Sequence, residues 1–167
     1  MNPYERCPVY RTEHFLLRQV APDDAESLLE CYSDPTAVAN MNADNCTNGF
    51  YMTTVEEIGR CIGFWLREYA AGYYVRLAVI DRATDRTIGT VEIFGGKTGV
   101  LRIDLPVSYE KQEILEELLA LAKKEMRLDF PMDRMCFKAH MPVRRAAAQA
   151  QGFVASSYRE GGGYYEY

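Results

Sequence analysis

The chain has 167 residues, of which 48% are hydrophobic and 26% charged, and its formal net charge is −5. This size and composition predict a single domain over residues 1–167. The acidic balance argues against nucleic acid as a partner, because phosphate binding needs a basic face. No segment is long enough to span a bilayer, and residues 1–10 lack the apolar stretch of a signal peptide. We therefore expect a cytoplasmic protein with no membrane partner.

The five cysteines lie at positions 7, 31, 46, 61 and 136. Their number is odd, and no two have the C-x-x-C spacing of a zinc or redox site. Free thiols in a reducing compartment and no metal site are the expectation.

The first half of the chain predicts one strand, two helices and a loop. The strand covers His14–Val20, and Pro22 opens a helix that Ser33-Asp34-Pro35 ends. Residues 36–52 are polar and predict a loop with at most one short helical turn, either functional or merely a flexible connection. Either Thr53 with Glu56 or Thr54 with Glu57 then fits a capping box for a helix that ends near Gly72.

The second half predicts more strands than helices. The expected strands are 73–81, 87–94, 100–107, 134–140, 153–158 and 164–167, with a turn at 95–99 and helices at 110–127 and 142–152. This order predicts an α+β sandwich with helices on both faces of a largely antiparallel sheet. The β–α–β unit from Val100 to His140 should supply one parallel strand pair.

With this order of elements, the chain resembles the GNAT superfamily of acyl-CoA-dependent N-acetyltransferases, near the branch of ribosomal-protein alanine N-acetyltransferases. The likeness covers about His14 to Tyr158. It rests on the element order, on Thr87–Glu92 (TIGTVE), which is similar to the "IGxxx" strand of the family, and on Gly152-Phe153 after the last helix. The resemblance implies a splayed parallel strand pair and acetyl transfer from acetyl-CoA to a primary amine. The acceptor would be a peptide N-terminus, a lysine or a small amine.

The resemblance also implies where the cofactor binds. The strand with Ile103, Leu105 and Val107 would pair with the pantetheine arm, and the next turn would hold the pyrophosphate. The family turn R/Q-x-x-G-x-G/A contains glycines that let the backbone approach phosphate, but Tyr109–Glu113 contain none. The cofactor motif is therefore degenerate. Its residues would be Lys111, Gln112, Glu113 and Ile114, and Glu110 and Glu113 would repel the anion.

Arg144 and Arg145 lie on the short helix, and two interpretations of this pair stay open. They would bind the cofactor phosphates in place of the lost glycine turn, or they would form the solvated face of the helix.

Two carboxylates on central strands are candidates for the catalytic base, Glu92 and Asp104. The structural alternative pairs Asp104 with Arg76, Arg102 or another strand neighbour as a solvated cross-strand pair. In the family, the helix that ends in Gly-Phe begins with N-x-x-S, but here those positions hold Met141 and Arg144. The tyrosine that serves the family as general acid is absent from this helix, and Tyr158 is the nearest substitute.

A second hypothesis keeps the fold without the activity. A non-catalytic GNAT-like module would use its cleft, or the tyrosine-rich segment Tyr164–Tyr167, to bind a partner or a second copy of itself. An exposed sheet edge at Tyr164–Tyr167 would need cover, which suggests a homodimer. The two hypotheses differ in whether the turn at residues 108–114 binds acetyl-CoA.

Overall fold

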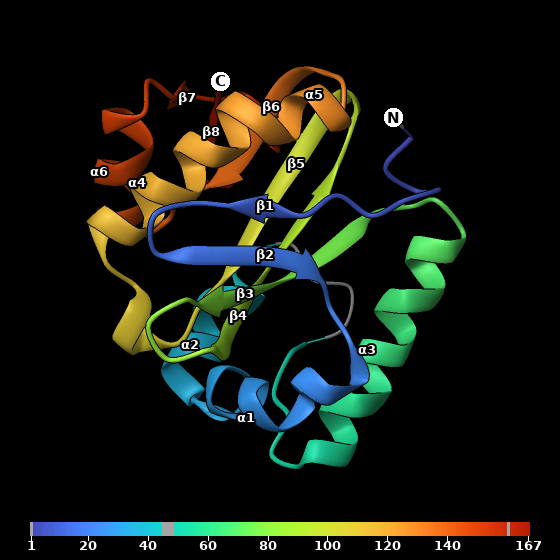
Figure 1. The fold of residues 1–167 in the computed structure, drawn as a ribbon. Helices are drawn as coiled ribbons and strands as arrows, with labels where there is room; N and C mark the ends of the chain where they lie inside the picture. Colours follow the sequence, from blue (N-terminus) through green and yellow to red (C-terminus); the bar gives the residue numbers. More distant parts are fainter. Residues whose placement is uncertain (1, 45–48, 160) are drawn as a thin grey trace. The chain divides into compact units, whose positions relative to one another are not determined.

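A computed structural model describes residues 2–44, 49–159 and 161–167 (Figure 1). Its strands hydrogen-bond in the order β1-β2-β3-β4-β5-β6-β8-β7. The strands are β1 (Tyr10–Arg11), β2 (Phe15–Gln19), β3 (Val75–Asp81), β4 (Arg86–Phe94), β5 (Gly96–Asp104), β6 (Met132–Lys138), β7 (Val154–Ala155) and β8 (Tyr164–Glu166). Strands β5 and β6 are parallel, whereas β1–β2, β2–β3, β6–β8 and β7–β8 are antiparallel. The predicted α+β fold with one parallel pair in a largely antiparallel sheet is confirmed.

The helical segments lie in three groups between these strands. They are η1 (Pro22–Asp24), α1 (Ala25–Ser33), α2 (Pro35–Asn42), α3 (Val55–Ala70), η2 (Val107–Tyr109), α4 (Gln112–Leu121), η3 (Ala122–Met126), α5 (Arg127–Asp129) and α6 (Pro142–Ala150). The predicted helix 110–127 is interrupted by η3, which is a π-helical turn. No helix that the structure describes is long and apolar enough to cross a membrane.

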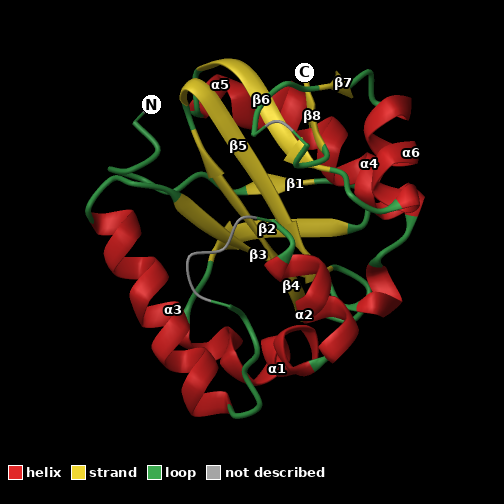
Figure 2. Cartoon of the chain, turned by 180° about the vertical axis from the view of Figure 1, so that it is seen from behind, coloured by secondary structure: helices red, strands yellow, loops and turns green. Residues whose placement is uncertain are grey.

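The chain divides into two compact units. The first comprises residues 1–92 and 103–109, and the second comprises residues 93–102 and 110–167. In the first unit, α1, α2 and α3 pack together with β3 around one apolar cluster (Figure 2). Leu28, Tyr32, Ile58 and Ile62 in this cluster are completely buried. In the second unit, α4 packs against α6.

Helix α2 corrects the prediction of a loop over residues 36–52. Asp34 caps this helix, because its Oδ1 accepts hydrogen bonds from the backbone N–H groups of Thr36 (2.7 Å) and Ala37 (3.0 Å). Pro35 occupies the first helical position, where its missing N–H costs nothing. The Asp34-Pro35 pair was predicted only to end a helix, whereas it both ends α1 and starts α2. The polar residues after this pair therefore favoured the prediction of a loop. Residues 45–48 lie outside the described residues.

Helix α3 starts at the second of the two predicted capping boxes. Thr54 Oγ1 accepts a hydrogen bond from the N–H of Glu57, and the Glu57 carboxylate accepts one from the N–H of Thr54. Ile58, Ile62 and Trp65 form its buried face.

Strand β5 begins at Gly96, inside the segment predicted as a turn. Its register with β6 runs from Gly96–Met132 to Leu101–Phe137, while β5 itself continues to Asp104. A Cβ atom at Gly99 would lie 2.5 Å from Met132 Sδ. Gly99 therefore permits close packing of β5 against β6.

The C-terminal hairpin corrects the expected sheet edge. Strand β8 pairs with β6 on one side and with β7 on the other. The backbone of Tyr164–Glu166 is therefore covered within the second unit, and the edge belongs to β7. The argument for a homodimer through Tyr164–Tyr167 loses its basis.

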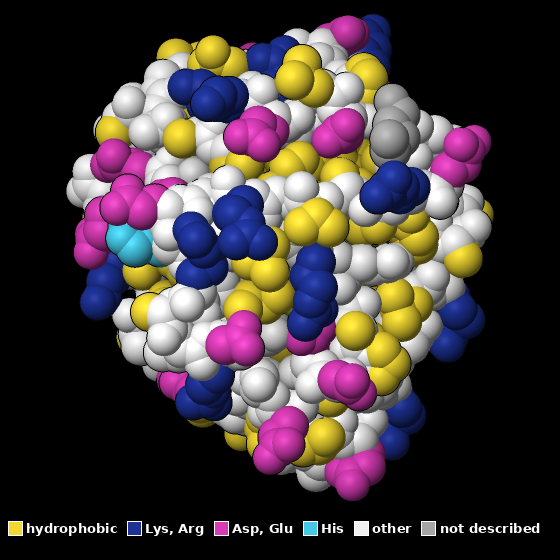
Figure 3. Space-filling view, viewed as in Figure 1, with side chains coloured by type: hydrophobic (Ala, Val, Ile, Leu, Met, Phe, Trp, Pro, Cys, Tyr) yellow, Lys and Arg dark blue, Asp and Glu magenta, His cyan; other side chains and the backbone are white. Residues whose placement is uncertain are grey.

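Charges and cysteines give few further signals. Lys and Arg side chains are interspersed with Asp and Glu over the face shown in Figure 3. Among the described residues, no group of three or more His, Cys, Asp or Glu could hold a metal ion. Cys7, Cys31, Cys61 and Cys136 are free thiols. Cys46 lies outside the described part of the chain.

Candidate functional site

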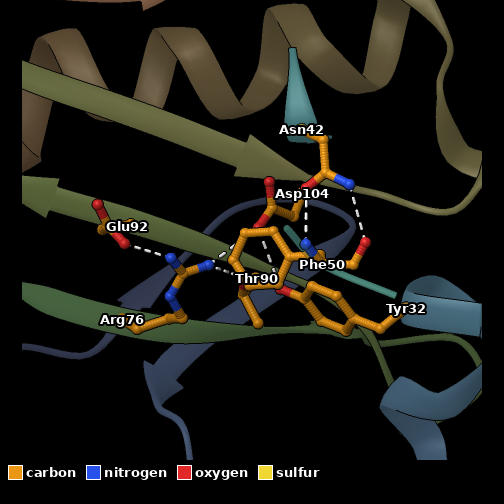
Figure 4. Close-up of polar contacts among 7 residues, drawn as sticks. All are labelled: Tyr32, Asn42, Phe50, Arg76, Thr90, Glu92 and Asp104. Carbon is orange, nitrogen blue, oxygen red and sulfur yellow. Dashed lines mark hydrogen bonds and ion pairs between the residues drawn. The ribbon is translucent and has the colours of Figure 1, made fainter. Parts of the chain in front are cut away.

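A buried polar network in the first unit joins three neighbouring strands (Figure 4). Arg76 on β3 donates from Nη1 to Asp104 Oδ2 on β5 (2.9 Å) and to Thr90 Oγ1 on β4 (3.0 Å). Arg76 is 3% exposed and the side chain of Asp104 is 1% exposed. Two opposite charges thus lie in the interior, where only close pairing compensates for lost hydration.

Glu92 on β4 is the second carboxylate of this network. Its Oε2 accepts from Arg76 Nη2, so one guanidinium binds both candidate bases. The Glu92 side chain is 17% exposed, against 1% for Asp104. Glu92 is therefore the carboxylate that solvent can reach.

Tyr32 on α1 completes the network. Its hydroxyl donates to Asp104 Oδ2 (3.1 Å) and lies 2.8 Å from Thr90 Oγ1. A phenol carries one proton, and Tyr32 donates that proton to Asp104. Thr90 must then donate to the Tyr32 oxygen while it accepts from Arg76. Each hydroxyl proton has one defined acceptor, which fixes the orientation of all four side chains.

Aromatic rings enclose the Arg76 guanidinium. Its central carbon lies 4.3 Å from the ring centroid of Trp65 and 5.7 Å from that of Phe50. Asn42 holds Phe50 in place, because its side-chain amide donates to Phe50 O (2.8 Å) and accepts from Phe50 N (2.6 Å). Arg76 Nε is buried and has no hydrogen-bond partner within the described ranges. The flat face of a guanidinium is weakly hydrated, so stacking on Trp65 stabilises it there.

The protonation states follow from this environment. Burial, and next the nearby Asp104 carboxylate, raise the pKa of Tyr32 well above its usual value, so the phenol stays protonated. Burial by itself would lower the pKa of Arg76, but Glu92, Tyr32 and Asp104 outweigh burial and raise it. One guanidinium and two carboxylates leave the network with a single negative charge.

Sequence reasoning identified part of this site. Glu92 and Asp104 were predicted as alternative bases, and the structure places both on Arg76. The proposed Arg76–Asp104 pair exists, but the prediction that it is solvated is wrong, because neighbouring strands and α1 bury it. Tyr32 and Thr90 were missed as members. Polar residues at alternate strand positions, Thr90 with Glu92 and Arg102 with Asp104, were the available signal.

The start of α4 is the second feature of interest, and it lies in the second unit. Lys111 is the N-cap residue, and its side chain does not cap the helix. Lys111, Gln112 and Glu113 are exposed and Ile114 is half-buried. The first backbone N–H groups of this ten-residue helix therefore lack the acceptor that an N-cap side chain supplies, which is the arrangement that binds anions.

Arg144 neutralises one of the two acids expected to repel an anion here. Arg144 Nε lies 2.5 Å from Glu110 Oε1, and Nη2 donates to Glu110 Oε2 (3.1 Å). The two side chains are 4% and 7% exposed. The interpretation of Arg144 as part of a solvated face is wrong, and Glu110 is a paired acid. Glu113 remains exposed in the first turn of α4.

The remaining predicted residues are dispersed. Ile103 and Leu105 are buried at 1% and 2% exposure, whereas Val107 lies in η2 and is 47% exposed. Tyr158 follows β7 in the second unit, where its ring packs edge-on against Tyr164 and its hydroxyl accepts from Arg159 Nε (3.2 Å).

The fold matches that of solved acetyltransferases. A Vibrio cholerae protein assigned as a ribosomal-protein-serine acetyltransferase is 18% identical, with 100% of this chain and 99% of that chain covered and a TM-score of 0.69. RimL, a ribosomal L7/L12 α-N-protein acetyltransferase in complex with coenzyme A, is 15% identical over 95% and 94% of the chains, with a TM-score of 0.68. A GNAT-family acetyltransferase from Bacillus anthracis is 16% identical over 96% and 98%, with a TM-score of 0.66.

The sequence matches no family model and no curated protein. At such low identities, the structural likeness defines the fold alone. The chain has the GNAT fold, and its structural neighbours include ribosomal-protein acetyltransferases.

Proposed function

We propose that this protein is an N-acetyltransferase that transfers an acetyl group from acetyl-CoA to a primary amine, with Glu92 as the general base. The observation that carries this proposal is the attachment of a solvent-accessible carboxylate to a buried, fully charged guanidinium. Arg76 orients Glu92 while leaving its side chain 17% exposed. A general base needs a fixed position and access to the proton that it removes.

Asp104 is the weaker candidate for the base. Its Oδ2 already accepts hydrogen bonds from Arg76 and Tyr32, and its side chain is almost completely buried. An incoming amine would have to displace both donors. We assign Asp104 the role of positioning Arg76, which in turn positions Glu92.

The chemistry around Glu92 favours a cationic acceptor. The network carries one net negative charge, and Trp65 and Phe50 add aromatic rings beside it. A protonated primary amine is attracted to such a site and loses its proton to Glu92 before attack. A peptide N-terminus, a lysine side chain and a small amine all meet this requirement.

The residues of the second unit fit an anionic cofactor. The start of α4 offers uncapped N–H groups from Gln112, Glu113 and Ile114, and the Arg144–Glu110 pair removes one repulsive charge. Lys111 adds a cationic side chain at the same turn. Acetyl-CoA would supply the acetyl group as an activated thioester. The cofactor roles of Ile103, Leu105 and Val107, and the role of Tyr158 as the acid that reprotonates the thiolate, stay predictions.

The test is an acetylation assay with purified protein, acetyl-CoA and three acceptors: a peptide with a free N-terminus, an N-terminally blocked peptide with one lysine, and a small diamine. Thiol release and product mass are measured. We expect Glu92→Gln to lower kcat/KM about 10²–10⁴-fold. Glu68→Gln, which removes a carboxylate from α3, is the matched control and should keep full activity.

Thermal melting with acetyl-CoA separates the two hypotheses. An enzyme should be stabilised by about 2.7 kcal/mol at a hundredfold excess over Kd and should release thiol. Stabilisation without thiol release from any acceptor would favour a module that binds the cofactor only. No stabilisation at millimolar acetyl-CoA would overturn the proposal.

A further inference from the structure

A polar depression lies in the first unit, between α1 and the beginning of β4. We call it the α1–β4 pocket, and its cavity volume is about 80 Å³. The residues that line it are Ser27 and Glu30 of α1, Thr84 of the β3–β4 turn, Arg86, Thr87 and Ile88 of β4, and Pro106 and Tyr109 beyond β5. None of these residues belongs to the Arg76 network, so the pocket is a separate site.

The pocket has an apolar floor and a charged rim. Ile88 and Pro106 are buried, whereas Glu30 and Arg86 are exposed. A cavity of about 80 Å³ is well below the volume of sites for drug-sized ligands, so it admits only a much smaller molecule. The pocket therefore suits a small ligand with charged groups at its outer end.

Two opposite charges line this pocket without pairing. Neither Glu30 nor Arg86 has a hydrogen-bond or ion-pair partner within residues 2–44, 49–159 and 161–167. By contrast, Arg18 of the same unit pairs with Asp24 (2.7 Å). Glu30 and Arg86 thus remain available to two different groups of one ligand.

Tyr109 also lines the pocket and contributes an acceptor. Its hydroxyl donates to Asp81 Oδ2 (2.6 Å), which leaves the phenol oxygen free to accept. This hydrogen bond, followed by burial, raises the pKa of Tyr109 to about 12. Glu30 raises this pKa slightly further and Arg86 lowers it, as expected if both charges lie near the ring.

We propose that the α1–β4 pocket binds a small zwitterion, an α-amino acid, with its carboxylate on Arg86 and its ammonium on Glu30. Each charge on the rim then meets its complement, and the Tyr109 oxygen accepts a second hydrogen bond from the ammonium. A phosphate ester or dicarboxylate would face both Glu30 and Asp81, and a diamine would face Arg86. The floor formed by Ile88 and Pro106 accommodates a short side chain.

The test is a titration of ¹⁵N-labelled protein with L-serine, followed by amide chemical shifts. We expect saturable shifts confined to residues 27–30, 84–88 and 106–109. L-Serinamide lacks the carboxylate and N-acetyl-L-serine lacks the ammonium, so each should bind about tenfold or more weakly. Equal binding of all three compounds, or no saturable shift with L-serine, would refute the proposal.

Matched variants assign the two contacts. Glu30→Gln and Arg86→Gln should each weaken L-serine binding about tenfold or more. Glu26→Gln on the same helix and Arg11→Gln remove equal charges outside the pocket and should leave the affinity unchanged. If the control variants weaken binding as much as the pocket variants, only net charge matters and the site is not specific. Acetylated L-serine in the presence of acetyl-CoA would make the amino acid an acceptor substrate and would overturn its assignment to a separate site.

Discussion

Gly89 on β4 lies directly against the backbone of Asp104 at the end of β5. A Cβ atom at Gly89 would be 2.2 Å from the Asp104 carbonyl oxygen and 3.1 Å from Leu105 Cδ2. No side chain fits in this space, so the glycine of the TIGTVE segment is required for close strand packing. This approach also sets the position of Asp104 relative to Thr90 and Glu92, one and three residues beyond Gly89.

Gly89→Ala should therefore destabilise the protein strongly. The added methyl group meets backbone, which cannot rotate away, so we expect a loss of about 3 kcal/mol or more in the free energy of unfolding. Gly59→Ala is the matched control, because nothing lies within 4 Å of a Cβ at that position in α3. It should stabilise the protein by about 1 kcal/mol through higher helix propensity. Urea denaturation measures both changes, and equal effects would contradict the packing argument.

Arg76→Met should strongly destabilise the protein. It leaves the buried Asp104 carboxylate without its cationic partner, at an expected cost of about 3–5 kcal/mol. Arg60→Met on the exposed face of α3 should change stability by less than about 0.5 kcal/mol. Adding Asp104→Asn to Arg76→Met should recover part of the loss, since the uncompensated charge is then removed. Additive destabilisation in the double variant would argue against the ion pair.

Asp24 should make the protein sensitive to acid. Burial alone would raise the pKa of Asp24, but hydrogen bonds from Arg18, Thr87 and the Ala21 N–H outweigh it and hold this pKa below its usual value. A carboxyl group with a lowered folded-state pKa stabilises the fold above its unfolded-state pKa of about 3.9 and loses this effect as the pH falls through the folded-state value.

The comparison of wild type with Asp24→Asn tests this dependence. The variant should be less stable than wild type at pH 7, and the difference should shrink as the pH falls below about 4. Asp23→Asn, at an exposed neighbouring position, should follow the wild-type curve. A constant difference between wild type and Asp24→Asn across this pH range would show that Asp24 does not gain protons on acid unfolding.

The Arg144–Glu110 pair should control anion binding at α4. Arg144→Met leaves Glu110 negatively charged and unpaired, so acetyl-CoA affinity should fall about tenfold or more. The double variant Glu110→Gln/Arg144→Met should recover most of this affinity, because the repulsive charge is gone. Lys124→Met removes one positive charge elsewhere in the second unit and serves as the control. Isothermal titration calorimetry gives the affinities, and a double variant as weak as Arg144→Met would mean that Arg144 itself binds the cofactor.

The sequence by itself predicted the order of the main elements apart from β1 and α2, two alternative capping boxes for α3 of which one is present, and the parallel pair of β5 and β6. These features depend on local signals: hydrophobic periodicity, capping residues and the length of a β–α–β connection. It also named Glu92 and Asp104, because acids on apolar strands are unusual enough to attract attention. Helix α2 was predicted as a loop with at most one helical turn, because its asparagines are typical of loops. In addition, one Asp-Pro pair both ends α1 and starts α2.

Only the tertiary structure decided which charges pair. Arg76, Glu92 and Asp104 lie on three different strands, and Tyr32 comes from a helix 58 residues away from its partner Thr90. Likewise, the sequence alone predicts that Glu110 repels an anion. In the folded chain, Arg144, which lies 34 residues later, pairs with Glu110. Electrostatic energies depend on distance and burial, which a linear pattern does not contain, so whether a charge repels, orients or neutralises was settled only by the folded chain.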